Sequence, residues 1–127
     1  IGSDQVADCG GRPVGKPGTH ERAVAQLTEL SGRTVVFHTG LALFDAASRE
    51  CQSALVDVRS TFRFLSAAEI EAYLRRERPY DCAGSAKIEA LGIALVEQLE
   101  SDDPTALVGL PLIALVSMLA REGVDIP

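Results

Sequence analysis

The 127-residue chain carries 12 basic and 18 acidic side chains, a net charge of −6, and 46% hydrophobic residues. This length allows one domain with a hydrophobic core of its own, and the mixed composition is ordinary for a globular protein. The acidic balance argues against a surface for duplex nucleic acid, which is usually basic, but it leaves open the binding of a single nucleotide.

The first seventeen residues predict a strand followed by a reversal of the chain. Residues 1–6 form a strand end that carries Asp4 and Gln5, and residues 9–15 are rich in glycine and proline, as turns are. Such a turn brings Lys16 near Asp4. A carboxylate that faces an ammonium group beside glycines suits metal-bound phosphate, and a solvated surface pair is the simpler alternative.

Residues 19–63 predict one helix and a long hairpin. Thr19 is a candidate N-cap for a helix through residue 30, in which apolar side chains recur at helical spacing. Residues 33–44 form the first arm of the hairpin, and their continuous apolar character predicts burial on both faces. Residues 51–63 return antiparallel with alternating faces. Gly40, inside the first arm, indicates either a packing position or a bulge or close approach of the backbone.

The rest of the chain alternates between helices and short strands in this interpretation. A capping box begins a helix over residues 66–76. Residues 92–99 are expected to form a strand, and after a turn residues 105–108 form a second, short and buried one. The closing helix covers residues 110–122, with a proline in its first turn.

The loop over residues 81–85 consists of small residues that allow a ligand to approach the backbone. Lys87 and Glu89 follow at a spacing of two, so they share a face if the chain is extended there. Lys87 could reach a phosphate or pair with Glu89, and the sequence leaves both open. Cys82 has no evident base beside it, so a nucleophilic thiol is not expected.

Seven short motifs occur in one order along the chain and share a spacing with a known family. They are Ile-Gly-Ser-Asp-Gln-Val (1–6), Gly-Lys-Pro (15–17), Leu-Ser-Gly-Arg (30–33), His-Thr-Gly (38–40), Phe-Arg (62–63), Asp-Cys-Ala-Gly-Ser (81–85) and Val-Gly-Leu-Pro-Leu (108–112). Together they resemble the Maf family of nucleoside triphosphate pyrophosphatases from residue 1 to about residue 122. The pair Asp4-Gln5 and the segment 83–89 are similar to the branch that prefers 7-methyl-GTP.

The resemblance implies an activity and a set of site residues. Family members cleave a nucleoside triphosphate between its α and β phosphates with a divalent cation, Mg²⁺ or Mn²⁺. By this resemblance Asp4 is the proton acceptor and can also hold the metal, and Lys16 binds phosphate. Gln5 and Glu89 match positions tied to base choice, and Lys87 is a further candidate for substrate binding.

Glu89 also has a physical case of its own. A guanine edge offers two adjacent N–H donors that a carboxylate accepts together, whereas a glutamine presents one acceptor and one donor. Methylation at N7 makes the base positive, and a carboxylate favours that charge.

The resemblance further implies a mixed α/β fold, with an elongated twisted sheet and flanking helices like that of inosine triphosphate pyrophosphatase, and a homodimer. Family members begin with a phosphate-binding segment of the Ser-x-x-Arg type that these 127 residues do not contain. We therefore expect one Maf-like domain over residues 1–127 that lacks its N-terminal segment. Two alternatives stay open, an interaction protein of septum formation and cell division, and a fragment without activity.

Three cysteines, Cys9, Cys51 and Cys82, are widely separated and odd in number. This pattern is typical of free thiols in the reducing cytoplasm and shows no metal-ligand spacing. The longest apolar stretch, residues 106–116, is too short to cross a bilayer. We therefore expect a cytoplasmic protein.

Overall fold

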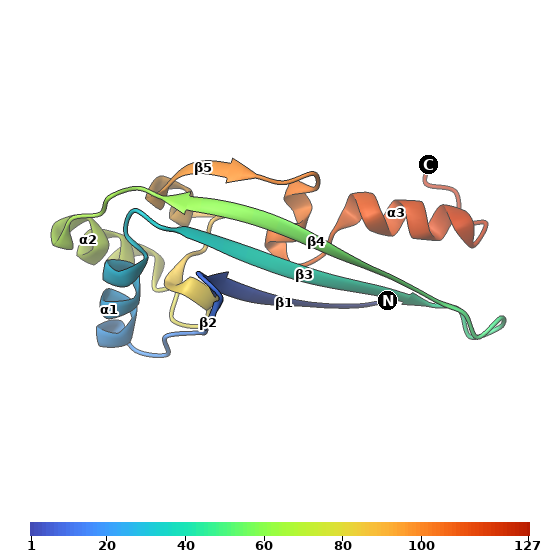
Figure 1. Ribbon diagram of the computed structural model, residues 1–127, viewed down its shortest axis with the longest axis horizontal. Coiled ribbons are helices and arrows are strands. Elements are labelled where there is room, and N and C mark those ends of the chain that lie inside the picture. Colours follow the sequence, from blue (N-terminus) through green and yellow to red (C-terminus); the bar gives the residue numbers. More distant parts are fainter.

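A computed structural model describes residues 1–127 and has a mixed α/β fold, as expected (Figure 1). Five strands form one antiparallel sheet in the order β2-β1-β3-β4-β5. The strands are β1 (Gly2–Cys9), β2 (Arg12–Val14), β3 (Thr34–Phe44), β4 (Cys51–Phe62) and β5 (Val96–Glu100). The α-helices are α1 (His20–Leu30), α2 (Ala67–Glu77) and α3 (Leu112–Arg121), and the 3₁₀ helices are η1 (Ala83–Ser85), η2 (Leu91–Leu95) and η3 (Pro104–Val108).

The β3–β4 hairpin is the long axis of the molecule (Figure 1). Its register runs from Thr34 opposite Thr61 to Phe44 opposite Cys51. The prediction that the first arm is buried on both faces is wrong. Burial alternates along β3, with every second residue from Val35 to Leu43 buried, the residues between them half-buried and Phe44 exposed, because helices cover only one face of the sheet.

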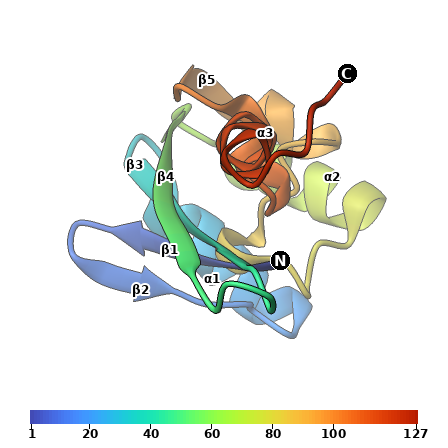
Figure 2. The same ribbon diagram turned by 90° about the vertical axis from the view of Figure 1, so that its right-hand side faces the viewer.

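All three α-helices lie along that one face of the sheet, with α1 and α2 near one end of the hairpin and α3 toward the other (Figures 1 and 2). The main core gathers α1 and α2 around Val35, Phe37 and Phe62. A smaller cluster packs α3 on Leu41 and Leu43. The two clusters use the same side of β3, so one strand face supports both.

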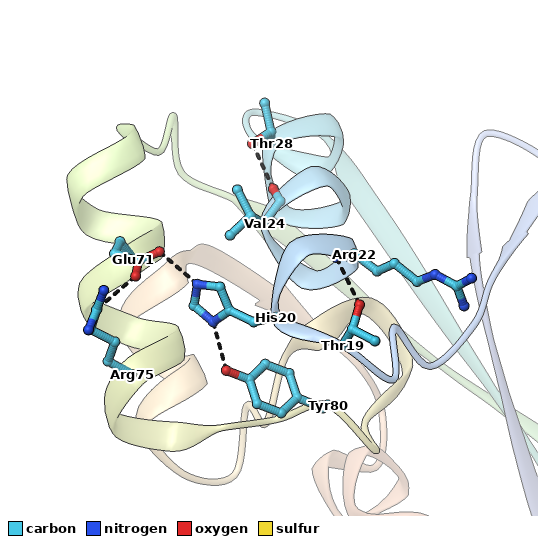
Figure 3. Close-up of polar contacts among 8 residues, drawn as sticks. All are labelled: Thr19, His20, Arg22, Val24, Thr28, Glu71, Arg75 and Tyr80. Atoms are coloured by element: carbon cyan, nitrogen blue, oxygen red, sulfur yellow. Dashed lines mark hydrogen bonds and ion pairs between the residues drawn. The ribbon is translucent and has the colours of Figure 1, made fainter.

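Capping residues set the starts of α1 and α2 as predicted. The Thr19 hydroxyl accepts a hydrogen bond from the Arg22 amide at 3.3 Å (Figure 3). Ser66 and Glu69 form a reciprocal capping box, in which each side chain accepts from the other residue's amide. The amide and hydroxyl of Ser66 hold the pKa of the Glu69 carboxyl below its usual range.

The predicted strand over residues 92–99 is half wrong, because residues 91–95 form η2 and only residues 96–100 form β5. The amides of Ala90 and Gly92 both donate to the Lys87 carbonyl, which curls the chain into a tight turn before β5 begins. The short β5 pairs with residues 59–62 at the end of β4, and the register shifts between Thr61 and Phe62.

The predicted short strand over residues 105–108 is also wrong, since these residues belong to η3. Asp103 accepts from the Thr105 amide at 3.1 Å and Pro104 opens the turn, so this stretch has a helical start that its apolar composition conceals. The closing helix begins two residues later than predicted, after Pro111. No helix in the structure is long and apolar enough to span a bilayer.

Candidate active site

A cavity of about 340 Å³ lies where β1, the loop after β2, the segment around η1 and the end of η3 meet. Four of the five predicted site residues line it. Its polar lining consists of Ser3, Asp4, Gln5, Lys16, Asp81, Cys82 and Glu89. Segments more than a hundred residues apart in the sequence therefore meet at one concave surface, which is the usual form of a small-molecule site.

Asp4 lies in β1 opposite Gly40 of β3. One of its carboxylate oxygens accepts from the Gln5 amide at 2.8 Å, which fixes the side chain while the rest of the carboxylate stays exposed at the cavity. β3 passes Gly40 without a bulge, and a Cβ there would lie 3.9 Å from the Asp4 carbonyl oxygen, an ordinary contact. Close backbone approach therefore does not explain this glycine.

Lys16 reaches the cavity from the loop that follows β2, as the turn-rich sequence predicts. It makes no ion pair with Asp4 or with any other carboxylate. Its ammonium group is thus available to an anionic ligand.

Glu89 lines the cavity because α2 holds the backbone on both sides of it. The Tyr73 hydroxyl oxygen accepts from the Lys87 amide at 3.0 Å, and a Glu77 carboxylate oxygen accepts from the Leu91 amide at 3.2 Å. Burial raises the pKa of Tyr73 to about 12, so its hydroxyl stays protonated at neutral pH.

Lys87 does not line the cavity. Its ammonium nitrogen lies 3.9 Å from a Glu77 carboxylate oxygen, on the side of α2. The sequence left two roles open for Lys87, contact with a phosphate and pairing with Glu89. In the structure Lys87 neither lines the cavity nor pairs with Glu89.

The side-chain amide nitrogen of Gln5, Nε2, makes its hydrogen bonds inside the protein. It donates to the Ala106 carbonyl at 2.8 Å and to the Thr39 hydroxyl at 2.9 Å, and the Thr39 hydroxyl in turn donates to the same carbonyl. The Ser3 hydroxyl lies 2.7 Å from the Gly109 carbonyl oxygen. β1 thereby holds η3, whose last residues form one wall of the cavity.

Sequence reasoning assigned no role to Ser3, Asp81 or residues 107–109, which also line the cavity. Ser3 and Asp81 lie inside motifs that carry the family resemblance, so their position was the available signal. Val108 and Gly109 lie inside the motif over residues 108–112 and carried the same signal. Leu107 lies outside every motif and reaches the cavity through the long-range contacts that hold η3 to β1.

The cavity is rich in negative charge. Asp4, Asp81 and Glu89 line it against the single ammonium of Lys16. Burial, and then the neighbouring Asp81 carboxylate, raise the pKa of the Cys82 thiol, which keeps it protonated at neutral pH. The structure therefore agrees with the sequence in giving no activated thiol.

The donor set suits a magnesium ion held jointly by protein and substrate. Mg²⁺ is usually bound through one or two carboxylates, with substrate phosphates and water completing its shell. Asp4 offers an exposed carboxylate at the cavity, although the chain contains no ready cluster of three or more metal ligands.

Both histidines have structural partners elsewhere. His20 lies between the Tyr80 hydroxyl and a Glu71 carboxylate oxygen, each at 2.8 Å, where it joins α1 to α2 (Figure 3). His38 pairs with Asp57 at 2.7 Å on the sheet. A second hollow, of about 610 Å³, lies between β4, β5 and α3, and none of the predicted site residues lines it.

Comparisons with known proteins agree with the motifs. A protein of Polaromonas sp. named 7-methyl-GTP pyrophosphatase is 63% identical over 124 residues, which are 98% of this chain and 57% of that protein. A protein of the same name from Cupriavidus metallidurans is 59% identical over 97% of this chain and 62% of its own length. One from Thiobacillus denitrificans is also 59% identical, over 99% of this chain and 63% of its own length. The chain thus spans about three fifths of these relatives.

The model of the family described as Maf-like protein matches residues 1–122. This match covers the strands, the helices and every residue that lines the cavity. The chain belongs to the Maf family.

Proposed function

We propose that the protein hydrolyses 7-methyl-GTP, or a closely related methylated guanine nucleotide, to the monophosphate and pyrophosphate. The observation that carries the proposal is that Asp4, Lys16 and Glu89 come from three separate segments and line one cavity. A candidate proton acceptor, a phosphate-binding cation and a base-reading carboxylate are thus within reach of one nucleotide. The names of the similar proteins support this substrate.

The charge of the cavity supports a cationic base. Three carboxylates lie along it, and the one cation beside Glu89 in sequence, Lys87, is turned toward Glu77. A neutral guanine gains two hydrogen bonds from the Glu89 carboxylate, whereas a 7-methylguanine gains these and a favourable electrostatic interaction. Glu89 therefore favours the methylated base over the unmethylated one.

Asp4 would take the proton of the water that attacks the α phosphate. Its carboxylate is oriented by the Gln5 amide and faces the cavity, so it can reach a water beside a bound phosphate. Lys16 would stabilise the negative charge that builds up on the departing pyrophosphate. A divalent cation, when bound, would supply charge neutralisation and lower the pKa of water, with Asp4 as its protein ligand.

We also propose that the protein is cytoplasmic and acts as a homodimer. Three free cysteines suit a reducing compartment. Exposed apolar side chains on the sheet and on α3, among them Leu55 and Ile113, are suited to contact a second copy.

The test is pyrophosphate release from 7-methyl-GTP, GTP, dTTP, UTP and CTP, with and without Mg²⁺ or Mn²⁺. Turnover that requires the metal and is highest for 7-methyl-GTP is expected. Asp4→Asn should abolish it, and Asp57→Asn, an exposed carboxylate of β4, should not. Turnover that is highest for dTTP or UTP, or full activity in Asp4→Asn, would contradict the proposal.

A binding role in septum formation makes the opposite prediction for the same variant. A protein that acts only by interaction keeps its cellular effect in Asp4→Asn. If the chain releases no pyrophosphate but a version extended upstream does, and this activity still depends on Asp4, the proposed chemistry holds for the longer protein.

A further inference from the structure

Gln26 of α1 joins the two loops that carry Lys16 and Glu89. Its amide nitrogen donates to the Gly15 carbonyl at 2.9 Å, and its amide oxygen accepts from the Ser85 hydroxyl. One side chain outside the cavity thus spans from the residue before Lys16 to the segment that continues into Glu89.

Ser85 has a backbone conformation that favours glycine, yet it carries a side chain that bonds to Gln26. Its φ is +54°, in the left-handed region where a residue with a side chain is strained and glycine is favoured. Ser85 is also fully buried, and Gln26 is the partner of its hydroxyl. A glycine would relieve the strain and remove a buried polar group. Compared with glycine, the serine at this position adds the hydroxyl that bonds to Gln26.

Two backbone hydrogen bonds run parallel to the Gln26 bridge. The Gly84 amide donates to the Gly15 carbonyl at 3.2 Å, and the Gly18 amide donates to the Tyr80 carbonyl at 2.9 Å. Tyr80 is fixed by its hydroxyl on His20, at the start of the helix that carries Gln26 (Figure 3). Both loops are thereby attached to α1 and to each other.

We propose that Gln26 and Ser85 are positioning residues that set the distance between the Lys16 ammonium and the Glu89 carboxylate. Neither side chain lines the cavity, so each acts through the loop it holds. This inference rests on the proposed function, because it assigns Lys16 to the phosphates and Glu89 to the base of one ligand. Its physical basis, a coupled pair of loops, does not depend on any ligand.

The first test uses the chain without nucleotide and measures amide hydrogen exchange. Gln26→Met keeps the length of the side chain and removes both hydrogen bonds, so exchange at Gly18 and Gly84 should rise together by about three- to tenfold. Ser85→Ala should raise both, and Gln26→Met should add little in that background. Thr28→Ala, on the same helix, should change neither. Exchange that rises in only one loop, or in neither, overturns the coupling.

The second test measures the affinity for 7-methyl-GTP and 7-methylguanosine in a double-mutant cycle with Lys16→Ala. Gln26→Met should lower the affinity for 7-methyl-GTP about three- to tenfold and leave the affinity for 7-methylguanosine nearly unchanged. In the Lys16→Ala background the effect of Gln26→Met should disappear. Full additivity of the two substitutions would mean a merely structural role and overturn the proposal.

The two tests separate this proposal from the proposed function. If the unsubstituted chain binds neither ligand, the proposed function fails for this chain, and hydrogen exchange alone decides whether Gln26 couples the loops. If the chain binds 7-methyl-GTP but Gln26→Met changes neither exchange nor affinity, the positioning role fails and the proposed function stands.

Discussion

Backbone hydrogen bonds are made in different ways in two regions, the β3–β4 hairpin and the segment from residue 78 to residue 111. In the hairpin, eleven consecutive residue pairs face one another in regular register. The later segment has three 3₁₀ helices and one short strand, and side chains hold much of its backbone. The cavity lies between the irregular segment and β1, which pairs with β3 of the hairpin, so the sheet supplies a regular wall and the irregular segment supplies shape.

This difference has an energetic side. The hairpin is stabilised by apolar burial along one face, which is spread over many residues. The irregular segment depends on single polar residues such as Asp103 and Tyr73, each of which holds two parts of the chain. Core substitutions in the first region should therefore lower the free energy of unfolding most, and single substitutions in the second region should lower it less.

The largest effect is expected at the centre of the core. Phe62, at the end of β4, is 1% exposed and belongs to the main cluster. Phe62→Ala should lower the free energy of unfolding by about 3–5 kcal/mol, because it removes the burial and leaves a cavity. Urea denaturation measures this. Ser53→Ala on the same strand, at an exposed side chain, should change it by less than about 0.5 kcal/mol.

Gly92→Ala should break the irregular segment by crowding. A Cβ at residue 92 would lie 2.5 Å from the Lys87 carbonyl oxygen and 2.8 Å from the Lys87 amide nitrogen, which are backbone atoms that cannot turn away. We expect a loss of about 1–3 kcal/mol by urea denaturation and faster hydrogen exchange around Glu89. Gly2→Ala, where a Cβ has open space, is the control. Equal stability of the two variants would contradict this.

Asp103→Asn should loosen η3 from α3. The Asp103 carboxylate accepts from the amides of Thr105 at 3.1 Å and Ile113 at 2.9 Å, and an asparagine offers one acceptor oxygen fewer. The expected cost is about 1–2 kcal/mol by thermal or urea denaturation at pH 7.

The pH dependence of this variant gives a second check. Burial alone would raise the pKa of the Asp103 carboxyl, but the hydrogen bonds from Thr105 and Ile113 outweigh it and the pKa is lowered. A lowered pKa means that the carboxylate stabilises the fold above the unfolded pKa of about 3.9, and that this is lost as the pH falls through the folded value. The difference between the wild type and Asp103→Asn should therefore shrink below about pH 4. A difference that grows there would be the wrong sign.

The smallest effect is expected at the surface of α2. Ser66→Ala removes the hydroxyl that accepts from the Glu69 amide and should cost about 1 kcal/mol. Ser66→Asp keeps an acceptor at the cap and should stay close to the wild type. Thermal denaturation of the three proteins side by side would decide whether the cap contributes as expected.

The elements that could be predicted are those with local signals. Thr19 and Ser66 mark helix starts, and residues 45–50 mark the hairpin turn, because capping and turn chemistry act between near neighbours. The strands expected over 92–99 and 105–108 failed for the opposite reason. Their apolar residues fit a strand, and the side chains and carbonyls that bend them lie elsewhere, at Asp103 and Lys87.

The candidate site follows the same division. The motif resemblance indicated Asp4, Lys16 and Glu89, and the fold brings them to one cavity. The position of Lys87 depends on Glu77, one turn of α2 beyond Tyr73, and no local pattern indicates that pairing. Gln26 looks like any exposed helix residue in the sequence, since its two partners come from separate loops.

The contacts between β1 and η3 also fix when the cavity can exist. Ser3 and Gly109 are 106 residues apart, and Gln5 and Ala106 are 101 apart. A ribosome that adds about 5–20 residues per second takes roughly 5–20 s to cover that distance. During this time the sheet and its first helices can assemble. The side-chain amide of Gln5 then has no η3 carbonyl to which it can donate a hydrogen bond. A nascent chain that stalls before residue 104 thus has the five strands but no closed binding site, so ligand cannot stabilise this sheet until residues 104–109 have been added.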